Sequence, residues 1–319
     1  MIVLSQADVR DLLDLDALVD ALAAAHDDLS AGRASMPPRI AALVDEQEGL
    51  LGAMPSYLPS GGLACKLVSL FPHNRDRETH QAVICVFDPA NGTPLALMDG
   101  TYVTATRTAA GSALATRLLA RDDAKVLALI GTGVQARSHA RALPRVRHFE
   151  EIRVAGRAPA KAEALAEEIG PPARAVKSFE EAICGADVVA ATTHAVEPVV
   201  RREWLSPGVH VNSVGLNPRG REVDAATVAD SLLVVESRES ALALPPAGAP
   251  ELAGVDPGAV HAELGELVAG VKPGRASPEQ ITLYKSVGVA VQDAAAAGLV
   301  LAAARKRSVG REIELEENG

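Results

Sequence analysis

The chain is organised around one short stretch, Lys125-Val126-Leu127-Ala128-Leu129-Ile130-Gly131-Thr132-Gly133-Val134-Gln135-Ala136. An apolar run typical of a strand ends on a glycine turn and opens into a segment with helical character. In this strand–turn–helix context, the pattern G-x-G-x-x-A predicts a dinucleotide-binding turn. Gly131 permits the tight turn, Gly133 lets the backbone approach a pyrophosphate, and the small Ala136 permits close packing of helix on strand. An ordinary βα turn with two glycines is the alternative.

A regular alternation of strand-like and helical segments follows this turn. Alternation of this kind indicates an α/β fold, a doubly wound parallel sheet of the Rossmann type with helices on both faces. Strand-like segments are expected at 126–130, 151–155, around Val176, and at 187–191, 209–214 and 232–235, and helical segments at 134–142, 159–169 and 179–184.

The first third of the chain has a different rhythm. Ser5 and Asp14 are the expected N-caps of helical segments that run to residue 29, and Gly32 would close the second helix. A largely antiparallel sheet follows, with a hairpin between 83–88 and 94–98. Its strand-like runs are centred on 39–44, 50–54, 63–70 and 81–88.

Two longer helical segments frame the alternating region. Residues 104–120 form a connecting helix, and 287–305 form a long, alanine-rich one. Gln292 and Asp293 interrupt the apolar run of the latter, which therefore predicts a packed helix and not a membrane span. Residues 311–319 are expected to be a frayed, acidic tail.

The composition bounds the class of protein. With 48% hydrophobic and 23% charged residues, the chain is typical of globular proteins. A net charge of −10 argues against nucleic acid as a partner. Cys65, Cys85 and Cys184 lack the spacing of a zinc site or a disulfide framework, so we expect buried, reduced thiols and no metal. Charged residues precede any long apolar run, so we expect no signal peptide, no membrane partner and a cytoplasmic protein.

The residues one βα unit after the glycine turn bear on the cofactor. NAD sites usually place an acidic residue at the end of the second strand, where it holds the ribose 2′-hydroxyl. Here that position is Gly156, and Arg157 follows directly. A 2′-phosphate needs room and a cation, so the pair predicts NADPH (NADP⁺) as the cofactor, with NADH less favoured. The alternative for Arg157 is a solvated residue at the start of a helix.

Three cations in the first third of the chain suggest an anionic substrate. They are Arg39, Lys66 and Arg107, and Lys66 lies in an apolar, strand-like run. A lysine is costly to bury without a partner, and guanidinium groups suit a carboxylate bidentately. Taken singly, each of the three could be an ordinary surface cation.

In a series of short motifs, the chain resembles the ornithine cyclodeaminase/mu-crystallin family. The similar motifs run in family order from about residue 36 to 295. They are Met36-Pro37-Pro38-Arg39, Cys65-Lys66-Leu67-Val68, Thr79-His80-Gln81-Ala82, 91–100, 104–110, 131–136, 212–215, Arg221-Glu222-Val223-Asp224 and Lys285-Ser286-Val287-Gly288.

The resemblance implies roles for particular residues. Arg39, Lys66 and Arg107 match the family residues that hold a substrate carboxylate and polarise the carbon–nitrogen centre. Asp224 matches the catalytic carboxylate, although an ordinary helix N-cap is its alternative role. The residues that match dinucleotide contacts are Thr79, His80, Arg107, Gly131, Gly133, Val134, Gln135, Arg157, Thr192, Thr193, Val214 and Ser286.

The resemblance also implies a two-domain homodimer. Residues 1–115 with 297–319 would form an α+β substrate-binding and dimerisation domain, and 116–296 the inserted Rossmann NADP-binding domain. Relatives often carry two acidic residues around a glycine near 243–251, where this chain has a proline-rich segment with Glu251 alone. Substrate preference in that region would then differ.

Within the family, the missing acidic residue favours the NADPH-dependent ketimine reductases over the NAD-recycling ornithine cyclodeaminases. We therefore predict an oxidoreductase that reduces cyclic imine carboxylates, such as Δ1-piperideine-2-carboxylate or Δ1-pyrroline-2-carboxylate, to cyclic L-amino acids. The alternatives are an ornithine cyclodeaminase that makes L-proline and ammonia, an alanine-dehydrogenase-like reductive aminase, and a non-catalytic binding protein. The joint presence of Lys66 and Asp224 argues against the last of these.

Overall fold

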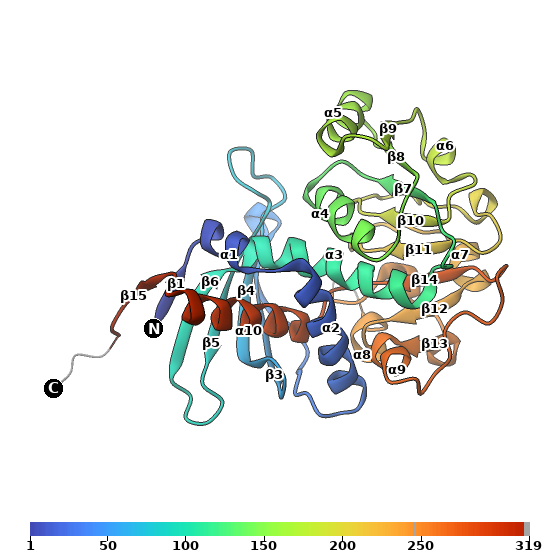
Figure 1. Ribbon diagram of the computed structural model, residues 1–319. Coiled ribbons are helices and arrows are strands. Elements are labelled where there is room, and N and C mark those ends of the chain that lie inside the picture. The colour runs from blue at the N-terminus through green and yellow to red at the C-terminus, as the bar shows by residue number, and fades with distance from the viewer. Residues whose placement is uncertain (245–246, 316–319) are drawn as a thin grey trace. The chain divides into compact units, whose positions relative to one another are not determined.

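A computed structural model describes residues 1–244 and 247–315 of the chain. The chain divides into two compact units (Figure 1). The first unit contains residues 1–107 and the described residues from Val289 onward, and the second contains Thr108–Gly288. Both boundaries fall earlier in the chain than the expected ones at 115/116 and 296/297. One of them lies inside a continuous helix, where helical periodicity offers no break to read.

The first unit is a seven-stranded sheet with helices packed against it. The strand order is β15-β1-β6-β5-β4-β3-β2. Neighbours from β2 to β6 pair antiparallel, β1 pairs parallel with β6, and β15 pairs antiparallel with β1. The strands are β1 (Ile2–Leu4), β2 (Ile40–Val44), β3 (Gly49–Leu58), β4 (Gly62–Leu70), β5 (His80–Phe87), β6 (Pro94–Asp99) and β15 (Arg311–Glu312). The helices are α1 (Gln6–Leu12), α2 (Leu15–Ser30), the first part of α3 (Gly100–Leu119) and α10 (Ala290–Arg307).

The predicted antiparallel sheet, hairpin and helix caps are all present. Ser5 and Asp8 form a reciprocal capping box at α1, and the Asp14 carboxylate accepts from the Ala17 amide at α2. The predicted frayed tail is wrong where the structure describes it, because Arg311–Glu312 pairs with β1. Residues 316–319 lie outside the described residues.

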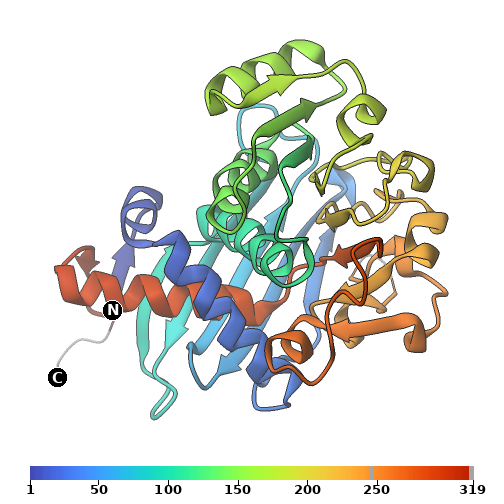
Figure 2. The same cartoon turned by 45° about the vertical axis from the view of Figure 1, so that its right-hand side comes forward.

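One face of this sheet is covered by α2 and α10, which lie side by side across the strands (Figure 2). Alternate residues along each strand point to opposite faces. On β4, Ala64 and Lys66 are buried, whereas Cys65, Leu67 and Ser69 are only partly covered. Lys66 therefore belongs to the buried face of the sheet, although it is charged.

The second unit is the predicted doubly wound sheet, and all of its strands are parallel. The strand order is β13-β12-β14-β11-β10-β7-β8-β9. The strands are β7 (Val126–Ile130), β8 (Glu151–Ala155), β9 (Ala173–Ala175), β10 (Val188–Ala191), β11 (His210–Ser213), β12 (Leu232–Val235), β13 (Val260–Glu263) and β14 (Thr282–Lys285). The helices are α4 (Val134–Ala142), α5 (Pro159–Ile169), α6 (Phe179–Ile183), α7 (Ala225–Asp230), α8 (Arg238–Ala241) and α9 (Leu264–Val268), with the rest of α3.

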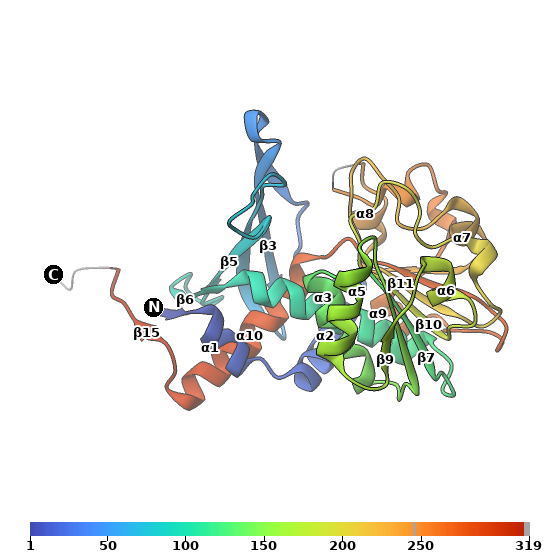
Figure 3. The same ribbon diagram turned by 90° about the horizontal axis from the view of Figure 1, so that it is seen from above.

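Both faces of the second sheet are buried. Ala128 and Ile130 of β7 pack in one cluster with Ala182 and Ile183 of α6. The intervening Leu127 and Leu129 are equally buried on the other face, where α4 packs on β7. Figure 3 shows α5 and α6 flanking these strands. A parallel sheet buried on both faces explains the continuous apolar run that precedes the glycine turn.

Three details of the second unit differ from expectation. Val176 lies just after β9 and not within it. β14 enters the sheet between β11 and β12, an insertion that the alternation did not predict. Cys184 is exposed rather than buried, while Cys65 and Cys85 are intermediate. In residues 1–244 and 247–315, none of the helices combines the length and the apolar character that a membrane span requires.

Candidate active site

The residues predicted to contact a dinucleotide in the second unit gather at one edge of its sheet. Each follows the carboxyl end of a parallel strand, and those ends lie along one edge. Gly131 follows β7, Arg157 lies two residues beyond β8, Thr192 follows β10, Val214 follows β11, and Ser286 follows β14. β7 and β10 are neighbours, and the strands that follow them, β8 and β11, lie on opposite sides of this pair in the strand order. Such a reversal is the switch point where these folds bind ligands.

The glycine turn has the geometry that a dinucleotide requires. Gly131 has a φ of +117°, and a Cβ atom there would lie 2.6 Å from Thr192 Oγ1. Gly133 caps α4, and a Cβ there would meet nothing within 4 Å. The turn is therefore closed around Gly131 and open around Gly133. An approaching phosphate would find the first amides of α4, which lack intrahelical partners.

Gly156 lies against this turn. A Cβ atom at Gly156 would come within 2.7 Å of the Thr132 Cγ2 atom. Arg157 is exposed and follows directly, one residue before the N-cap of α5, and Val134 and Gln135 begin α4. The end of the second strand thus offers a small residue and a cation in place of a carboxylate.

Two buried glutamates that had no predicted role tie the strand ends together. Glu222 accepts hydrogen bonds from the Thr193 amide at 2.6 Å, the Thr193 hydroxyl at 2.8 Å and the Ser213 hydroxyl at 2.8 Å. Glu236 accepts from the Ser286 hydroxyl at 2.5 Å. Glu236 could have been found from sequence, because it directly follows β12.

Glu251 belongs to the same network. It accepts from the Glu222 amide at 2.7 Å and pairs with the buried Lys285 at 3.2 Å. This acidic residue of the proline-rich segment therefore supports the strand ends of the second unit from within. Pro245 and Pro246, which begin that segment, lie outside the described residues.

Asp224 is a helix N-cap. Its carboxylate accepts from the Thr227 amide at 2.8 Å and from the Arg202 amide at 3.2 Å. The side chain is only partly covered. A carboxylate has about four acceptor positions, so capping leaves room for a further hydrogen bond.

The first unit contains a buried ion cluster around Lys66. The Lys66 ammonium lies 2.7 Å from Asp293 Oδ2, and Arg107 Nε donates to Asp293 Oδ1 at 3.0 Å. The side chains of Lys66, Asp293 and Arg107 are 2%, 2% and 6% exposed. Asp293, from the first turn of α10, was not predicted as a site residue. The one signal for it was that it interrupts an otherwise apolar helix.

Burial and neighbouring charges set the protonation states of this cluster. Burial, with the nearby charges of Arg107 and Arg39, lowers the pKa of Lys66 to about 8, against the opposing effect of Asp293. Burial alone would raise the pKa of Asp293, but Lys66 and Arg107 outweigh it, so the net direction is down. Lys66 is thus a cation at neutral pH with a pKa close to the working range of an acid catalyst.

Arg39 and His80 belong to the same neighbourhood in the first unit, because both interact electrostatically with Lys66. Burial, then Lys66 and Arg107, lower the pKa of His80 to about 4, so its imidazole is neutral at pH 7. Thr79 is exposed immediately before β5.

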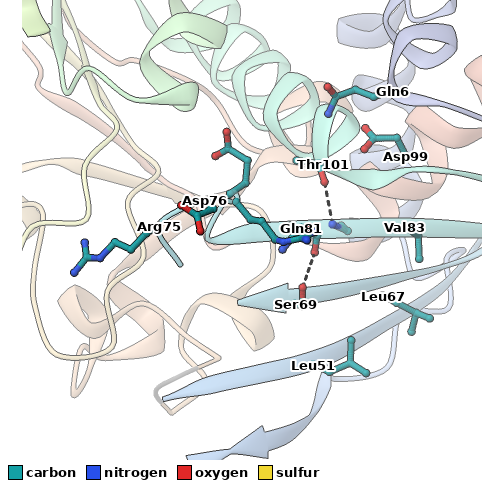
Figure 4. A pocket seen from close by; sticks show the side chains of 13 residues that line it. Gln6, Leu51, Leu67, Ser69, Arg75, Asp76, Gln81, Val83, Asp99 and Thr101 are labelled. Atoms are coloured by element: carbon teal, nitrogen blue, oxygen red, sulfur yellow. Dashed lines mark hydrogen bonds between the residues drawn. The ribbon is translucent and has the colours of Figure 1, made fainter. Parts of the chain in front are cut away.

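A hollow of about 920 Å³ in this unit lies apart from the cluster. Leu51, Leu67, Ser69 and Val83 line it, and they alternate with the buried residues of β3, β4 and β5 (Figure 4). The hollow therefore lies on the sheet face opposite Lys66. In Figure 4, Thr101 and Ser69 are bonded to the backbone of β5 at this face.

Comparison with known proteins shows which family of proteins the chain is similar to. A sequence model of the ornithine cyclodeaminase/mu-crystallin family matches residues 1–308. The ketimine reductase mu-crystallin of Mus musculus is 41% identical over 273 residues, which are 84% of this chain and 85% of that protein.

Two solved structures are similar in fold to this chain over nearly its whole length. The Thermococcus litoralis Δ1-pyrroline-2-carboxylate reductase, in complex with NADH and L-proline, has a TM-score of 0.93 and 39% identity, with 98% of this chain and 100% of that chain covered. An archaeal alanine dehydrogenase dimer with bound NAD has a TM-score of 0.92 and 33% identity, with 99% of both chains covered.

Proposed function

The chain belongs to the ornithine cyclodeaminase/mu-crystallin family, and on that premise we propose that it is an NADPH-dependent reductase of cyclic ketimine carboxylates. The observation on which the proposal rests is the buried Lys66 ammonium beside the Arg107 guanidinium. One group suits proton donation to an imine nitrogen, and the other suits a carboxylate. Relatives that reduce a ketimine or pyrroline-2-carboxylate support the same reaction class.

Each residue has a defined task in this proposal. Arg107 and Arg39 hold the substrate carboxylate and so orient the α-carbon. Lys66 donates a proton to the imine nitrogen as the C=N bond becomes CH–NH. Asp224 is the second group proposed to move a proton at that nitrogen. The bound dinucleotide supplies the hydride.

The proposed preference for NADPH rests on the end of β8. Gly156, which packs closely against Thr132, places no carboxylate at this position, and the exposed Arg157 provides a cation for a 2′-phosphate. The solved relatives contain NADH and NAD. The proposed preference for NADPH would therefore distinguish this chain from those two relatives, and it is tested separately.

Arg157→Ala is expected to raise the Kd for NADPH by roughly 10- to 100-fold, the loss of a charge-assisted hydrogen bond, and to leave the Kd for NADH unchanged. Fluorescence titration with each cofactor measures both. Lys161→Ala, an exposed position in α5 with the same change in charge, is the control. Equal affinity of the wild-type protein for NADPH and NADH contradicts the prediction.

The converse change introduces the missing carboxylate. Gly156→Asp, combined with Thr132→Ser to remove the Cγ2 atom that a Cβ would meet at 2.7 Å, is expected to favour NADH. If the double variant keeps the wild-type preference, the end of β8 does not select the cofactor.

The reaction itself is tested by NADPH oxidation. Piperideine-2-carboxylate, pyrroline-2-carboxylate, and pyruvate with ammonia are offered separately, and the first two are expected to turn over. Ornithine with catalytic NAD tests the cyclodeaminase, and proline formed without net cofactor turnover refutes the reductase. NADPH binding without turnover of any substrate favours the binding protein.

The assembly is proposed to be a homodimer formed through the sheet face that α2 and α10 leave uncovered. Leu51 on β3 and Val83 on β5 are 50% and 40% exposed. Apolar side chains gathered on one surface are typical of an interface. The archaeal alanine dehydrogenase is a dimer.

Val83→Arg is expected to shift the dimer toward monomer, because a two-fold interface places the buried charge on both copies. Light scattering after size exclusion measures the mass. Val196→Arg, at a 60% exposed valine of the second unit, should leave the mass unchanged. A monomeric wild-type protein, or a dimeric Val83→Arg variant, contradicts this interface.

A further inference from the structure

The geometry points to Asp293 as a positioning residue, whose two carboxylate oxygens hold the Lys66 ammonium and the Arg107 guanidinium in one fixed arrangement. This inference rests on the proposed function, because it takes Lys66 as the proton donor and Arg107 as a carboxylate ligand. Asp293 itself is not proposed to contact the substrate. It acts through the two cations.

Each oxygen of the Asp293 carboxylate contacts a different cation. Oδ2 lies 2.7 Å from Lys66 Nζ, and Oδ1 accepts from Arg107 Nε at 3.0 Å. Because each cation has its own oxygen, both interactions form at once. Two cations and one anion leave the cluster with one net positive charge, to which Arg39 adds. That surplus complements a substrate carboxylate, whereas without Asp293 the cations would only repel one another.

The residue before Asp293 completes the hold on Arg107. Gln292 Oε1 accepts from Arg107 Nη1 at 3.0 Å, and Gln292 Nε2 lies 3.0 Å from His26 Nε2. Burial, then Arg107, lower the pKa of His26 to about 4, so a neutral imidazole can accept this amide hydrogen bond. Consecutive residues of α10 therefore fix two nitrogens of one guanidinium.

A purely structural role explains this arrangement less well. Burying charges costs desolvation energy that often exceeds the gain from pairing them, so an apolar trio would serve stability as well or better. Asp293 lies in the first turn of α10, where the helix dipole favours an anion. The site thus keeps one carboxylate ionised between two cations that the proposed reaction uses.

The proposed role of Asp293 predicts a change in the pH profile. The groups that act on Lys66 are Asp293 from α10, Arg107 from α3 and Arg39, and His80 of β5 responds to Lys66. Of these, Asp293 keeps the Lys66 proton on. The alkaline limb of kcat/KM in the wild-type protein is expected near pH 8, where Lys66 deprotonates. Removing the carboxylate leaves burial and the cations unopposed, so the limb moves to lower pH.

Asp293→Asn is expected to shift this limb down by roughly 1 to 3 pH units and to raise KM, because Arg107 loses its anchor. Asp28→Asn removes another largely buried carboxylate of the same unit, which pairs with Arg33, and should leave the limb in place. A lower melting temperature with an unchanged limb means that Asp293 is merely structural and overturns the proposal.

Two further measurements test the inference if Asp293→Asn does not fold or if the protein does not turn over the imine. If Asp293→Asn does not fold, Asp293→Glu is expected to keep the limb near pH 8 while kcat falls, and an unchanged kcat overturns the positioning role. NMR of ¹³Cε-labelled lysine, with the Lys66 signal assigned by its loss in Lys66→Arg, follows the Lys66 pKa without any turnover. A lower pKa in Asp293→Asn then supports the inference even if no imine is reduced, and an unchanged pKa rejects it.

Discussion

Lys66→Met is expected to lower kcat/KM for the cyclic imine by about 10³-fold, the contribution of a well-placed general acid, while the Kd for NADPH stays unchanged. Methionine nearly preserves the length and volume of the side chain but cannot donate a proton. Asp293 keeps its bond to Arg107 at 3.0 Å, so the variant should fold. Steady-state NADPH oxidation and a cofactor titration measure the two quantities.

The control for Lys66 is its neighbour on the adjacent strand. Ile84 on β5 is its register partner and is fully buried. Ile84→Val removes one methylene from the same layer and tests whether slight repacking alone affects turnover. The prediction fails if Lys66→Met retains a large share of wild-type activity, or if Ile84→Val loses as much.

Gly131→Ala is expected to weaken NADPH binding by about 100-fold, the scale on which a small misplacement of a binding group acts, and to destabilise the fold by about 1–3 kcal/mol through backbone strain. The φ of +117° is one that alanine rarely adopts, and the new methyl group would meet Thr192 Oγ1 at 2.6 Å. Thr192 cannot yield easily, because its amide and its hydroxyl both donate to the Ile130 carbonyl. Titration and thermal unfolding measure the two effects.

Substitutions at two other glycines distinguish the effect of backbone strain from the effect of the added methyl group. Gly185 has a φ of +73° with open space around it, so Gly185→Ala carries strain without the contact and should keep NADPH affinity. At Gly133 a Cβ has open space and φ is negative, so Gly133→Ala should fold normally and weaken NADPH only by crowding the phosphates. If Gly131→Ala binds NADPH as tightly as the wild-type protein does, the glycine turn is not part of the cofactor site.

Local physical chemistry was sufficient to predict much of this molecule. The bounds of β7, α4, β8 and α5 follow from apolar runs, glycine and proline, whose effects act within a few residues. The caps at Ser5 and Asp14 are set in the same way, since a side chain there reaches an amide three positions on. The parallel sheet followed from the alternation of such segments.

What the sequence could not decide depends on contacts between distant parts of the chain. Asp293 and Arg107 are 186 positions apart, and their pairing exists because α10 packs on the sheet that carries Lys66. In sequence, Asp293 is only a break in an apolar helix. The entry of β14 between β11 and β12, and the hold of Glu222 on Thr193, have the same origin. A dinucleotide turn is local backbone geometry and can be read from the chain, whereas the charges that prepare Lys66 meet only in three dimensions.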